Sequence, residues 1–384
     1  MEGPRATKPE EVQSVIDLVN LVFRTGSQLK PTMGIEFPLL LCEANRDNMR
    51  IITENGRPVS DINYYPASIT VEGTTIRVAS IGAVCTHPDY RGRNYATAIL
   101  DDAEDKMRRE GTEIVLVSGD GSLYLRRNCV KVGGFYKALL KPKEELQENL
   151  TLNEMDNSNI RKAIHIYNQE AVRYHRTLHE FTQFHKGATT PWGKIRFESY
   201  LINIGGKAAA YIIARFFTDT NLAEVREFAG DRSAVIGGIY EMINTNGLTE
   251  CSLISAKNDV MNVLLEEQGI QLQHQDQQGT LKILNYPSLM NSLKPYMSQY
   301  LQDDAMDILK FEEADGKFII AVDDEVLTID DMELLGQLLF GQREEEPLVD
   351  VLFRGELADK PRLQQILSTV FPIPFPWTEN MNYI

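Results

Sequence analysis

The residues best suited to chemistry form a short basic turn, Arg91-Gly92-Arg93, between an apolar run and a helical pattern. The first backbone N–H groups of a helix have no partner within the helix, and the helix dipole adds partial positive charge there. Gly92 lets the backbone approach an anion closely, and the two arginines can donate charge-assisted hydrogen bonds. This arrangement suits a pyrophosphate. The alternative is a solvated basic turn that only caps the helix.

The segments on either side of this turn must position it. An apolar run predicts a strand that ends at Thr86, and the spacing of apolar residues predicts a helix over 94–111 that ends at Gly111. A second apolar run, Ile114–Val117, predicts a short strand that breaks at Gly119-Asp120-Gly121. The basic turn therefore lies between two strand ends, which favours an anion site over a simple cap.

The remainder of the first 145 residues predicts one more helix and a set of hairpins. Apolar residues at helical spacing fall within 12–23, and Asn55-Gly56 and Glu72-Gly73 are turn signals between strand-like runs. Helix, antiparallel meander, helix and strand in this order indicate an α+β fold, because a doubly wound sheet would need repeated crossovers.

The length of 384 residues predicts two or three domains. A charged stretch near 141–150 is typical of a linker, so the first domain is placed at 1–145 and the second at 146–286. The second repeats the order of the first loosely, with helices expected at 159–176, 233–247 and 258–269. The third, 287–384, combines helices with strands and ends in an aromatic, proline-rich tail.

The net charge of −16, from 39 Lys and Arg against 55 Asp and Glu, bears on the partners of the protein. An acidic chain is unsuited to non-specific nucleic-acid binding and favours a cationic small molecule. No run approaches the ~18 apolar residues that a membrane span needs, and the first residues lack the apolar core of a signal peptide. We therefore expect a soluble, cytoplasmic protein with no nucleic-acid or membrane partner.

Cysteine and histidine usage gives no sign of a metal site or a disulfide. His175 and His179 have i, i+4 spacing, but they lack the glutamate of an HExxH motif and a clear further ligand. The four cysteines are scattered without a CxxC pair, which is typical of free thiols in a reducing compartment: Cys42, Cys85, Cys129 and Cys251. We expect no metal.

The stretch VCTHPDYRGRNYATAILDDAE, residues 84–104, resembles motif A of the GNAT N-acetyltransferases, whose pyrophosphate-binding core is [QR]-x-x-G-x-[GA]. Arg91 and Ala96 match this core. Asn94 stands where the family usually has glycine. Asparagine tolerates left-handed backbone and helix caps better than other non-glycine residues, so the departure is mild, but it bears directly on the phosphate contacts.

A second stretch, GDGSLY at 119–124, is similar to an element of the Eis (enhanced intracellular survival) group within this family. Proteins of that group have a catalytic GNAT domain, a second GNAT-like domain without motif A, and a C-terminal domain resembling a sterol carrier protein. The resemblance implies tandem GNAT folds, each a mixed, largely antiparallel sheet with flanking helices, followed by a sterol-carrier-protein-like α+β domain. The second domain is then expected to be non-catalytic.

The same resemblance implies an N-acetyltransferase that uses acetyl-CoA as a co-substrate. A primary amine of a small cationic, aminoglycoside-like substrate would attack the thioester directly, without a metal. Two alternatives stay open: an acetyl-CoA-binding or regulatory protein without turnover, and a protein or peptide N-acetyltransferase. Because the family tends to assemble, a homo-oligomer is expected.

The resemblance also assigns residues to acetyl-CoA. Backbone N–H groups of Ala83, Val84 and Cys85 would bind the pantetheine and polarise the acetyl carbonyl. Gly119 and Asp120 would border the acetyl end. The pyrophosphate would lie on six consecutive residues: Arg91, Gly92, Arg93, Asn94, Tyr95 and Ala96.

Two residues are implied as catalytic, Tyr124 and Ile384. Tyr124 would give a proton to the departing thiolate, since a phenol with a pKa of about 10 matches a thiolate of similar basicity. Tyr136, which follows a Gly-Gly-Phe strand end, is the alternative donor. The C-terminal carboxylate of Ile384 would be the general base, and the alternative is a tail that only packs.

Overall fold

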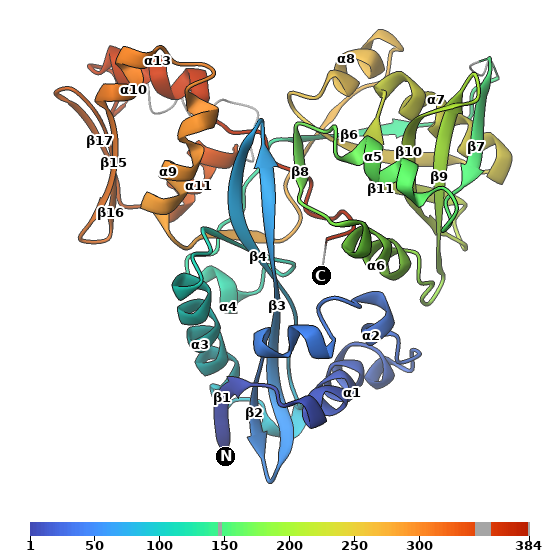
Figure 1. Ribbon diagram of the computed structural model, residues 1–384, viewed down its shortest axis with the longest axis horizontal. Coiled ribbons are helices and arrows are strands. Elements are labelled where there is room, and N and C mark those ends of the chain that lie inside the picture. Colours follow the sequence, from blue (N-terminus) through green and yellow to red (C-terminus); the bar gives the residue numbers. More distant parts are fainter. Residues whose placement is uncertain (145–147, 342–354, 383–384) are drawn as a thin grey trace.

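The computed structural model describes residues 1–144, 148–341 and 355–382. Figure 1 shows three lobes arranged around one long hairpin, formed by β3 (Arg57–Val71) and β4 (Thr74–Thr86). The turn between these strands has positive φ angles at Glu72 and Gly73, as a tight hairpin turn requires. The predicted turn at Asn55-Gly56 is also confirmed, since both residues have positive φ.

The hairpin belongs to the first sheet, whose order is β1-β2-β3-β4-β5-β14, with β8 added beside β3. The predicted helices are present as α1 (Val12–Phe23) and α3 (Tyr95–Arg109). Together with α2 (Met33–Glu36), α1 covers one face of the sheet, and α3 covers the other (Figure 1). The remaining strands of this sheet are β1 (Glu2–Ala6), β2 (Met49–Glu54), β5 (Ile114–Val117), β8 (Val172–Tyr174) and β14 (Thr280–Ile283).

The second sheet also has seven strands, in the order β13-β6-β12-β11-β10-β9-β7. Helices α7 (Arg232–Asn246) and α8 (Val260–Glu267) pack on one face, and α5 (Ile160–Tyr167) and α6 (Leu178–Ala188) on the other. Its strands are β6 (Phe135–Leu140), β7 (Leu150–Glu154), β9 (Ile195–Ile204), β10 (Lys207–Phe217), β11 (Leu222–Gly230), β12 (Glu250–Ala256) and β13 (Gln273–Gln275).

The helix predicted at 159–176 is wrong beyond Tyr167. The chain leaves the helix there and forms β8, which pairs antiparallel with β3 in register Ile69↔Tyr174 to Val71↔Val172. The edge of β3 at residues 69–71 supplies the backbone hydrogen-bond partners of β8. The local spacing of apolar residues does not indicate a partner so distant in the sequence, so the prediction of a helix fails here. The helices predicted at 233–247 and 258–269 are confirmed as α7 and α8.

The two sheets exchange one strand each. β6 lies in the second sheet between β12 and β13, although it precedes the linker predicted at 141–150. β14 returns from the second segment to pair antiparallel with β5 of the first sheet. The domain limits 1–145, 146–286 and 287–384 stay predictions, but the first two segments are interlocked through these strands.

The third lobe has an antiparallel sheet, β15 (Leu309–Ala314), β16 (Lys317–Val322) and β17 (Glu325–Ile329). The core of this lobe extends to the turn end of the β3–β4 hairpin, because Ile69 and Ile76 belong to the same cluster of buried side chains as the residues of the lobe. The α+β class is thus confirmed, while the likeness to a sterol carrier protein stays a prediction. The helices of this lobe are α9 (Tyr286–Met297), α10 (Asp303–Ile308), α11 (Met332–Phe340) and α13 (Pro361–Val370).

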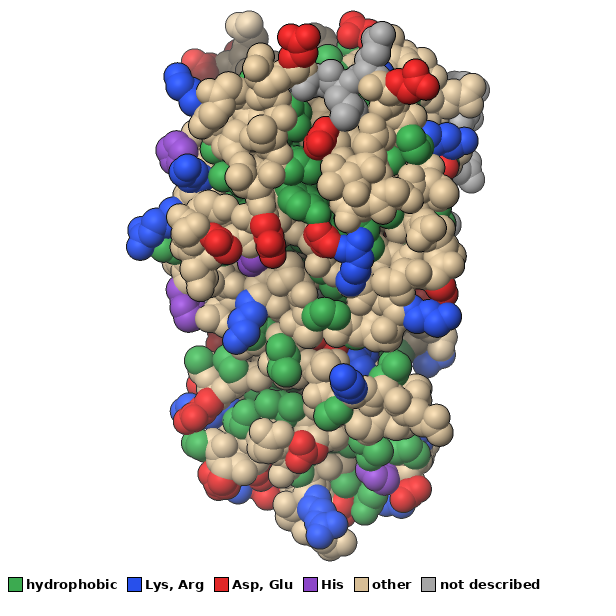
Figure 2. Space-filling view, turned by 90° about the vertical axis from the view of Figure 1, so that its right-hand side faces the viewer, with side chains coloured by type: hydrophobic (Ala, Val, Ile, Leu, Met, Phe, Trp, Pro, Cys, Tyr) green, Lys and Arg blue, Asp and Glu red, His purple; other side chains and the backbone are tan. Residues whose placement is uncertain are grey.

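One face of the molecule carries charges of both signs side by side. On the face seen in Figure 2, acidic and basic side chains are interspersed, and hydrophobic side chains gather mainly in the lower half, over the first lobe. The net negative charge is therefore not collected in one patch on this face. Within the described ranges, no helix is long and apolar enough to cross a membrane.

Candidate active site

The centre of the site is a gap between two parallel strands. β4 and β5 pair only from Val78↔Ile114 to Ile81↔Val117, after which β5 ends while β4 continues to Thr86. We call this gap the split; its walls are residues 82–86 of β4 and residues 118–124 after β5. Backbone groups of β4 that lack a strand partner on this side are available to a ligand that enters the split.

A β-bulge shapes the β4 wall. The partners on β3 jump from Asn63↔Gly82 to Asp61↔Cys85, so β4 carries an extra residue, and Ala83 has a φ of 51°. Bulges re-aim the residues around them. Here Val84 packs on the side of α3, whereas Ala83 and Cys85 pack on the side of α1. The three predicted pantetheine-binding residues are therefore brought to the split together.

Cys85 itself is a buried thiol. Its Sγ donates a hydrogen bond to Asp61 Oδ1 at 2.7 Å. Burial, followed by the neighbouring Asp61, raises the pKa of Cys85 well above its usual value. The thiol therefore stays protonated, and a role for Cys85 as a nucleophile is not supported.

The basic turn lies between β4 and α3. Gly92 has a φ of 77°, and Asn94 has φ 60° and ψ 17°, the left-handed conformation, at the N-cap of α3. The Asn94 side chain makes no capping hydrogen bond, so the first amide groups of the helix, at Tyr95 and Ala96, have no side-chain cap. Asn94 thus supplies the backbone geometry of glycine without blocking the helix end.

The side chains of the turn are largely accessible. Arg91 and Arg93 are both exposed. Arg91 Nε donates a long hydrogen bond, 3.3 Å, to the carbonyl of Thr86, and the Arg93 guanidinium lies 4.9 Å from the centre of the Tyr90 ring. These weak contacts leave donors free to turn toward an anion at the start of α3, which fits the pyrophosphate of acetyl-CoA.

Tyr95, one of the predicted pyrophosphate-binding residues, uses its side chain in another contact. The hydroxyl of Tyr95 donates to Glu54 Oε1 at 2.6 Å. This hydrogen bond raises the pKa of Tyr95 above its usual value. Tyr95 can therefore serve a phosphate only through its backbone N–H.

The opposite wall of the split carries Gly119, Asp120 and Tyr124. The carbonyl of Gly119 accepts a hydrogen bond from Thr280 Oγ1 at 2.9 Å, so β14 supports this wall. Asp120 is exposed and pairs with Lys131 at 2.7 Å, and this hydrogen bond lowers the pKa of Asp120. Asp120 is thus held at the rim as a carboxylate.

Tyr124 lies on α4 (Ser122–Leu125) and packs in the same cluster as Val84 of the opposite wall. Burial raises the pKa of its phenol to about 12, so the group stays protonated throughout the neutral range. Tyr136, the alternative donor, lies on β6 of the second sheet, paired with Ser255 and His274. The structure brings Tyr124 to the split, and it does not bring Tyr136 there.

The C-terminal residue Ile384 lies outside the described residues. The described part of the C-terminal segment ends at Asn382, which lines a small cavity together with Ser80, Ile81, Val117 and Ser118. These residues flank the point where β4 and β5 separate. The segment thus reaches the base of the split, where Thr378 and Asn382 are buried.

Two groups of residues were missed by sequence reasoning. Asp61 and Asn63 lie under the bulge, completely buried, and Asn63 Oδ1 finds no hydrogen-bond partner among the described residues. Asp61 and Asn63 alternate with apolar residues along β3, a pattern that predicts a strand face exposed to solvent. In the structure, α1 and α2 cover that face. The second group is the Arg176–Glu227 ion pair, which holds the C-terminal segment; no local pattern connects residues that far apart.

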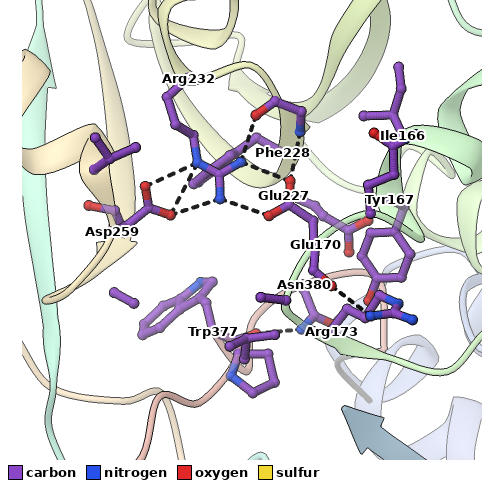
Figure 3. A pocket seen from close by; sticks show the side chains of 18 of the residues that line it. Ile166, Tyr167, Glu170, Arg173, Glu227, Phe228, Arg232, Asp259, Trp377 and Asn380 are labelled. Atoms are coloured by element: carbon purple, nitrogen blue, oxygen red, sulfur yellow. Dashed lines mark hydrogen bonds and ion pairs between the residues drawn. The ribbon is translucent and has the colours of Figure 1, made fainter. Parts of the chain in front are cut away.

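A larger cavity of about 990 Å³ lies in the second lobe, between the second sheet and the C-terminal segment (Figure 3). Arg232, at the start of α7, is paired with both Glu170 and Asp259, at 2.8 and 2.9 Å. The N-terminus of α7 is capped by Asp231, whose side chain accepts a hydrogen bond from the backbone N–H of Ala234. Since Arg232 is neutralised and the N-terminus of α7 is capped, the start of α7 lacks the anion-binding features of the basic turn.

Within residues 1–144, 148–341 and 355–382, no group of three or more His, Cys, Asp or Glu side chains is placed to hold a metal ion.

Comparisons with known proteins fit this site. Residues 4–129 match the family described as acetyltransferase (GNAT) domain, a range that includes the basic turn, Gly119 and Tyr124 but not Tyr136. No curated protein matches the sequence.

Solved structures resemble the whole chain. A GCN5-related N-acetyltransferase from Anabaena variabilis has a TM-score of 0.67 at 16% identity, covering 97% of this chain and 98% of its own. One from Kribbella flavida has a TM-score of 0.62 at 12% identity, covering 99% and 97%. Eis1 from Mycobacterium abscessus has a TM-score of 0.61 at 12% identity, covering 96% of each chain. Residues 4–129 thus resemble a GNAT acetyltransferase domain, within a chain whose overall fold is that of these solved proteins.

Proposed function

We propose that the protein is an acetyl-CoA-dependent N-acetyltransferase that acetylates a primary amine of a small cationic, aminoglycoside-like substrate. The observation that carries the proposal is the split between β4 and β5, with the Ala83 bulge on one wall and Gly119 and Tyr124 on the other. The uncapped N-terminus of α3 and the exposed Arg91 lie at the end of β4, where an anionic co-substrate would extend.

In the proposed reaction the amine nitrogen attacks the acetyl carbonyl and the bond to the CoA sulfur breaks. Backbone N–H groups around Val84 stabilise the charge that develops on the carbonyl oxygen. Tyr124 donates a proton to the departing thiolate, which its raised pKa of about 12 allows because the phenol is protonated beforehand. The C-terminal carboxylate of Ile384 takes the proton of the amine.

The acidic composition supports a cationic acceptor. The formal net charge of −16 attracts polyamines and repels anions at low ionic strength. The aminoglycoside-like class rests on the resemblance of residues 119–124 to the Eis group.

We also propose that the second lobe is a non-catalytic GNAT-like repeat. Antiparallel β9, β10 and β11 are followed by α7 and by β12, which is parallel to β11, the same order as β2, β3, β4, α3 and β5. The neutralised Arg232 supports its lack of a CoA site. The sterol-carrier-like third domain and assembly into a homo-oligomer rest on the sequence resemblance, and light scattering tests the assembly.

The proposal is tested by release of the CoA thiol from acetyl-CoA in the presence of a panel of amines, with calorimetric titration of acetyl-CoA alongside. Replacing Arg91 and Arg93 by Ala should weaken acetyl-CoA binding about tenfold, as expected for lost charge-assisted phosphate contacts. Arg161→Ala, an exposed position on α5, is the matched control for loss of charge and should bind normally.

The outcomes separate the open alternatives. Binding without turnover of any amine or peptide would favour a regulatory acetyl-CoA-binding protein, and turnover of peptides alone would favour a peptide N-acetyltransferase. Absence of both binding and turnover would refute the proposal. Extending the C-terminus by several residues tests the carboxylate, and full activity of that variant would exclude its role as base.

A further inference from the structure

The C-terminal segment 371–382, which we call the tail, runs along the second sheet toward the split. Trp377 packs edge-on against Phe135 of β6, with 5.1 Å between ring centroids. Glu379 pairs with Arg215 of β10 at 2.8 Å. Trp377 and Asn380 also form a wall of the large cavity (Figure 3). The tail is thus packed against the second sheet from Trp377 on, whereas Phe371, Ile373 and Phe375 belong to the core of the third lobe.

One buried ion pair holds the end of the tail. The two Nη atoms of Arg176 donate to the two carboxylate oxygens of Glu227, each at 2.8 Å. The backbone N–H of Met381 donates to Glu227 Oε2 at 3.0 Å, and Arg176 Nε donates to Asn382 Oδ1 at 2.6 Å. The side chains of Arg176 and Glu227 are 0% and 5% exposed, so water does not compete for these bonds.

The tail supplies bonds that the pair needs. Besides Arg176 and Met381, Glu227 accepts only from the Tyr211 hydroxyl, at 2.6 Å, among the described residues. Burial raises the pKa of Glu227, but Arg176 and these donors outweigh it and lower the pKa below its usual value, so Glu227 stays charged. A charge buried without full hydrogen bonding is costly. Keeping the pair satisfied therefore requires that Met381 and Asn382 stay in place.

The pair also connects the two sheets. Arg176 follows β8, which pairs with β3 of the first sheet, whereas Glu227 lies on β11 of the second. Its tail partner Asn382 lines the cavity at the base of the split. One contact thus fixes the first sheet, the second sheet and the tail relative to one another.

We propose that Arg176 and Glu227 are positioning residues that hold the end of the described tail, Met381 and Asn382, at the base of the split. This inference rests on the proposed function, in which the C-terminal carboxylate that follows the tail is the general base. Arg176 and Glu227 act through their hydrogen bonds to Asn382 and Met381.

The test uses full-length Asn382→Ala and Glu227→Gln. Asn382→Ala removes a bond to the tail and leaves the ion pair intact, so it stays informative if Glu227→Gln fails to fold. Glu170→Gln is the control, because it weakens a partly buried carboxylate–arginine contact of the second lobe, to Arg232, without a hydrogen bond to the tail. Asn382→Asp keeps the acceptor for Arg176 and is the conservative rescue.

Two readouts are measured. Hydrogen–deuterium exchange of the peptide that covers the tail should rise at least tenfold in Asn382→Ala and Glu227→Gln, and stay at the wild-type rate in Glu170→Gln. With acetyl-CoA and an accepted amine, kcat should fall at least tenfold in the first two variants, while KM for acetyl-CoA stays within twofold. Asn382→Asp should keep kcat within threefold of wild type.

The two proposals fail in different ways. Unchanged exchange in folded Asn382→Ala would overturn the anchoring role, and raised exchange with an unchanged kcat would overturn the positioning role. If the wild-type protein turns over no amine, the proposed function fails, yet the exchange measurement still decides whether the pair anchors the tail.

Discussion

The ring of Tyr124 lies against the α-carbon of Gly119. A β-carbon placed on Gly119 would come within 2.9 Å of Tyr124 Cε2, closer than side-chain contacts allow. The φ angle of Gly119 is not in the left-handed region, so the backbone does not require glycine there. Glycine is required by the ring, and the position of the proposed proton donor is therefore set by the strand end after β5.

Gly119→Ala should lower kcat about tenfold, because the added methyl must displace the phenol by a few tenths of an ångström from its place at the split. Steady-state kinetics measures this. Gly121→Ala is the matched control, since a β-carbon at Gly121 has nothing within 4 Å, and its kcat should be that of the wild type. Equal losses of kcat in Gly119→Ala and Gly121→Ala would show that the contact between Gly119 and the Tyr124 ring does not affect the reaction.

Tyr124→Phe should lower kcat by about 10²–10³-fold with a small effect on KM, as removal of a general acid does. The raised pKa of Tyr124, about 12, means that the phenol stays protonated as the pH rises through 9 and 10. The wild-type kcat should therefore show no alkaline decline from this group below pH 10. Tyr136→Phe should retain full activity, and a large loss in that variant instead would reassign the donor.

The local elements around the site could be predicted because their signals are local. The hairpin turn at Asn55-Gly56 and the amphipathic helix after the basic turn follow from backbone preference and periodicity alone, and both are present. The left-handed backbone at Asn94 also follows from residue type. These features place the basic turn at the start of α3.

What could not be predicted depends on contacts between distant parts of the chain. The β8 strand, the exchange of β6 and β14, and the Arg176–Glu227 pair each join segments more than 50 residues apart, and composition or periodicity does not encode such partners. The burial of Asp61 could not be predicted for the same reason. Its place in an alternating strand indicates an exposed side chain, but α1 and α2 pack over it.

Asn94→Ala should raise KM for acetyl-CoA several-fold and destabilise the protein by about 1 kcal/mol, because alanine is strained in the left-handed conformation that Asn94 adopts. Asn94→Gly should be close to wild type in both respects. Asn55→Ala provides the control: its φ of 50° imposes a similar strain in a hairpin turn away from the split. It should lose similar stability in urea denaturation, with an unchanged KM.

The strand exchange predicts a particular stability defect. Glu104 of α3 is buried and binds both Arg127, at 3.0 Å, and Lys282 of β14, at 2.6 Å. Lys282→Met should cost about 2 kcal/mol in urea denaturation, since one partner of a buried carboxylate is lost and the other remains. Lys131→Met, which breaks only the exposed pair with Asp120, should cause no measurable change. A silent Lys282→Met would contradict the pairing of β14 with β5.

The buried carboxyl of Asp61 predicts how stability depends on pH. Burial raises its pKa to about 7, against the lowering effect of hydrogen bonds from Cys85 and Asn63, whereas the pKa in the unfolded chain is near the ordinary aspartate value of 3.8. The folded protein therefore binds more protons than the unfolded chain between about pH 4 and 7, and the contribution of Asp61 to stability falls as the pH rises through that window.

Asp61→Asn removes this pH-dependent loss of stability. The side-chain amide of the new asparagine can donate to Asn63 Oδ1, which has no partner among the described residues. Relative to wild type, the variant should gain on the order of 2–4 kcal/mol between pH 4 and pH 8 in urea denaturation at each pH. Asp17→Asn, at an exposed position on α1, should show the wild-type dependence. A constant difference between Asp61→Asn and wild type at every pH would mean that Asp61 is ionised in the folded protein like an ordinary aspartate.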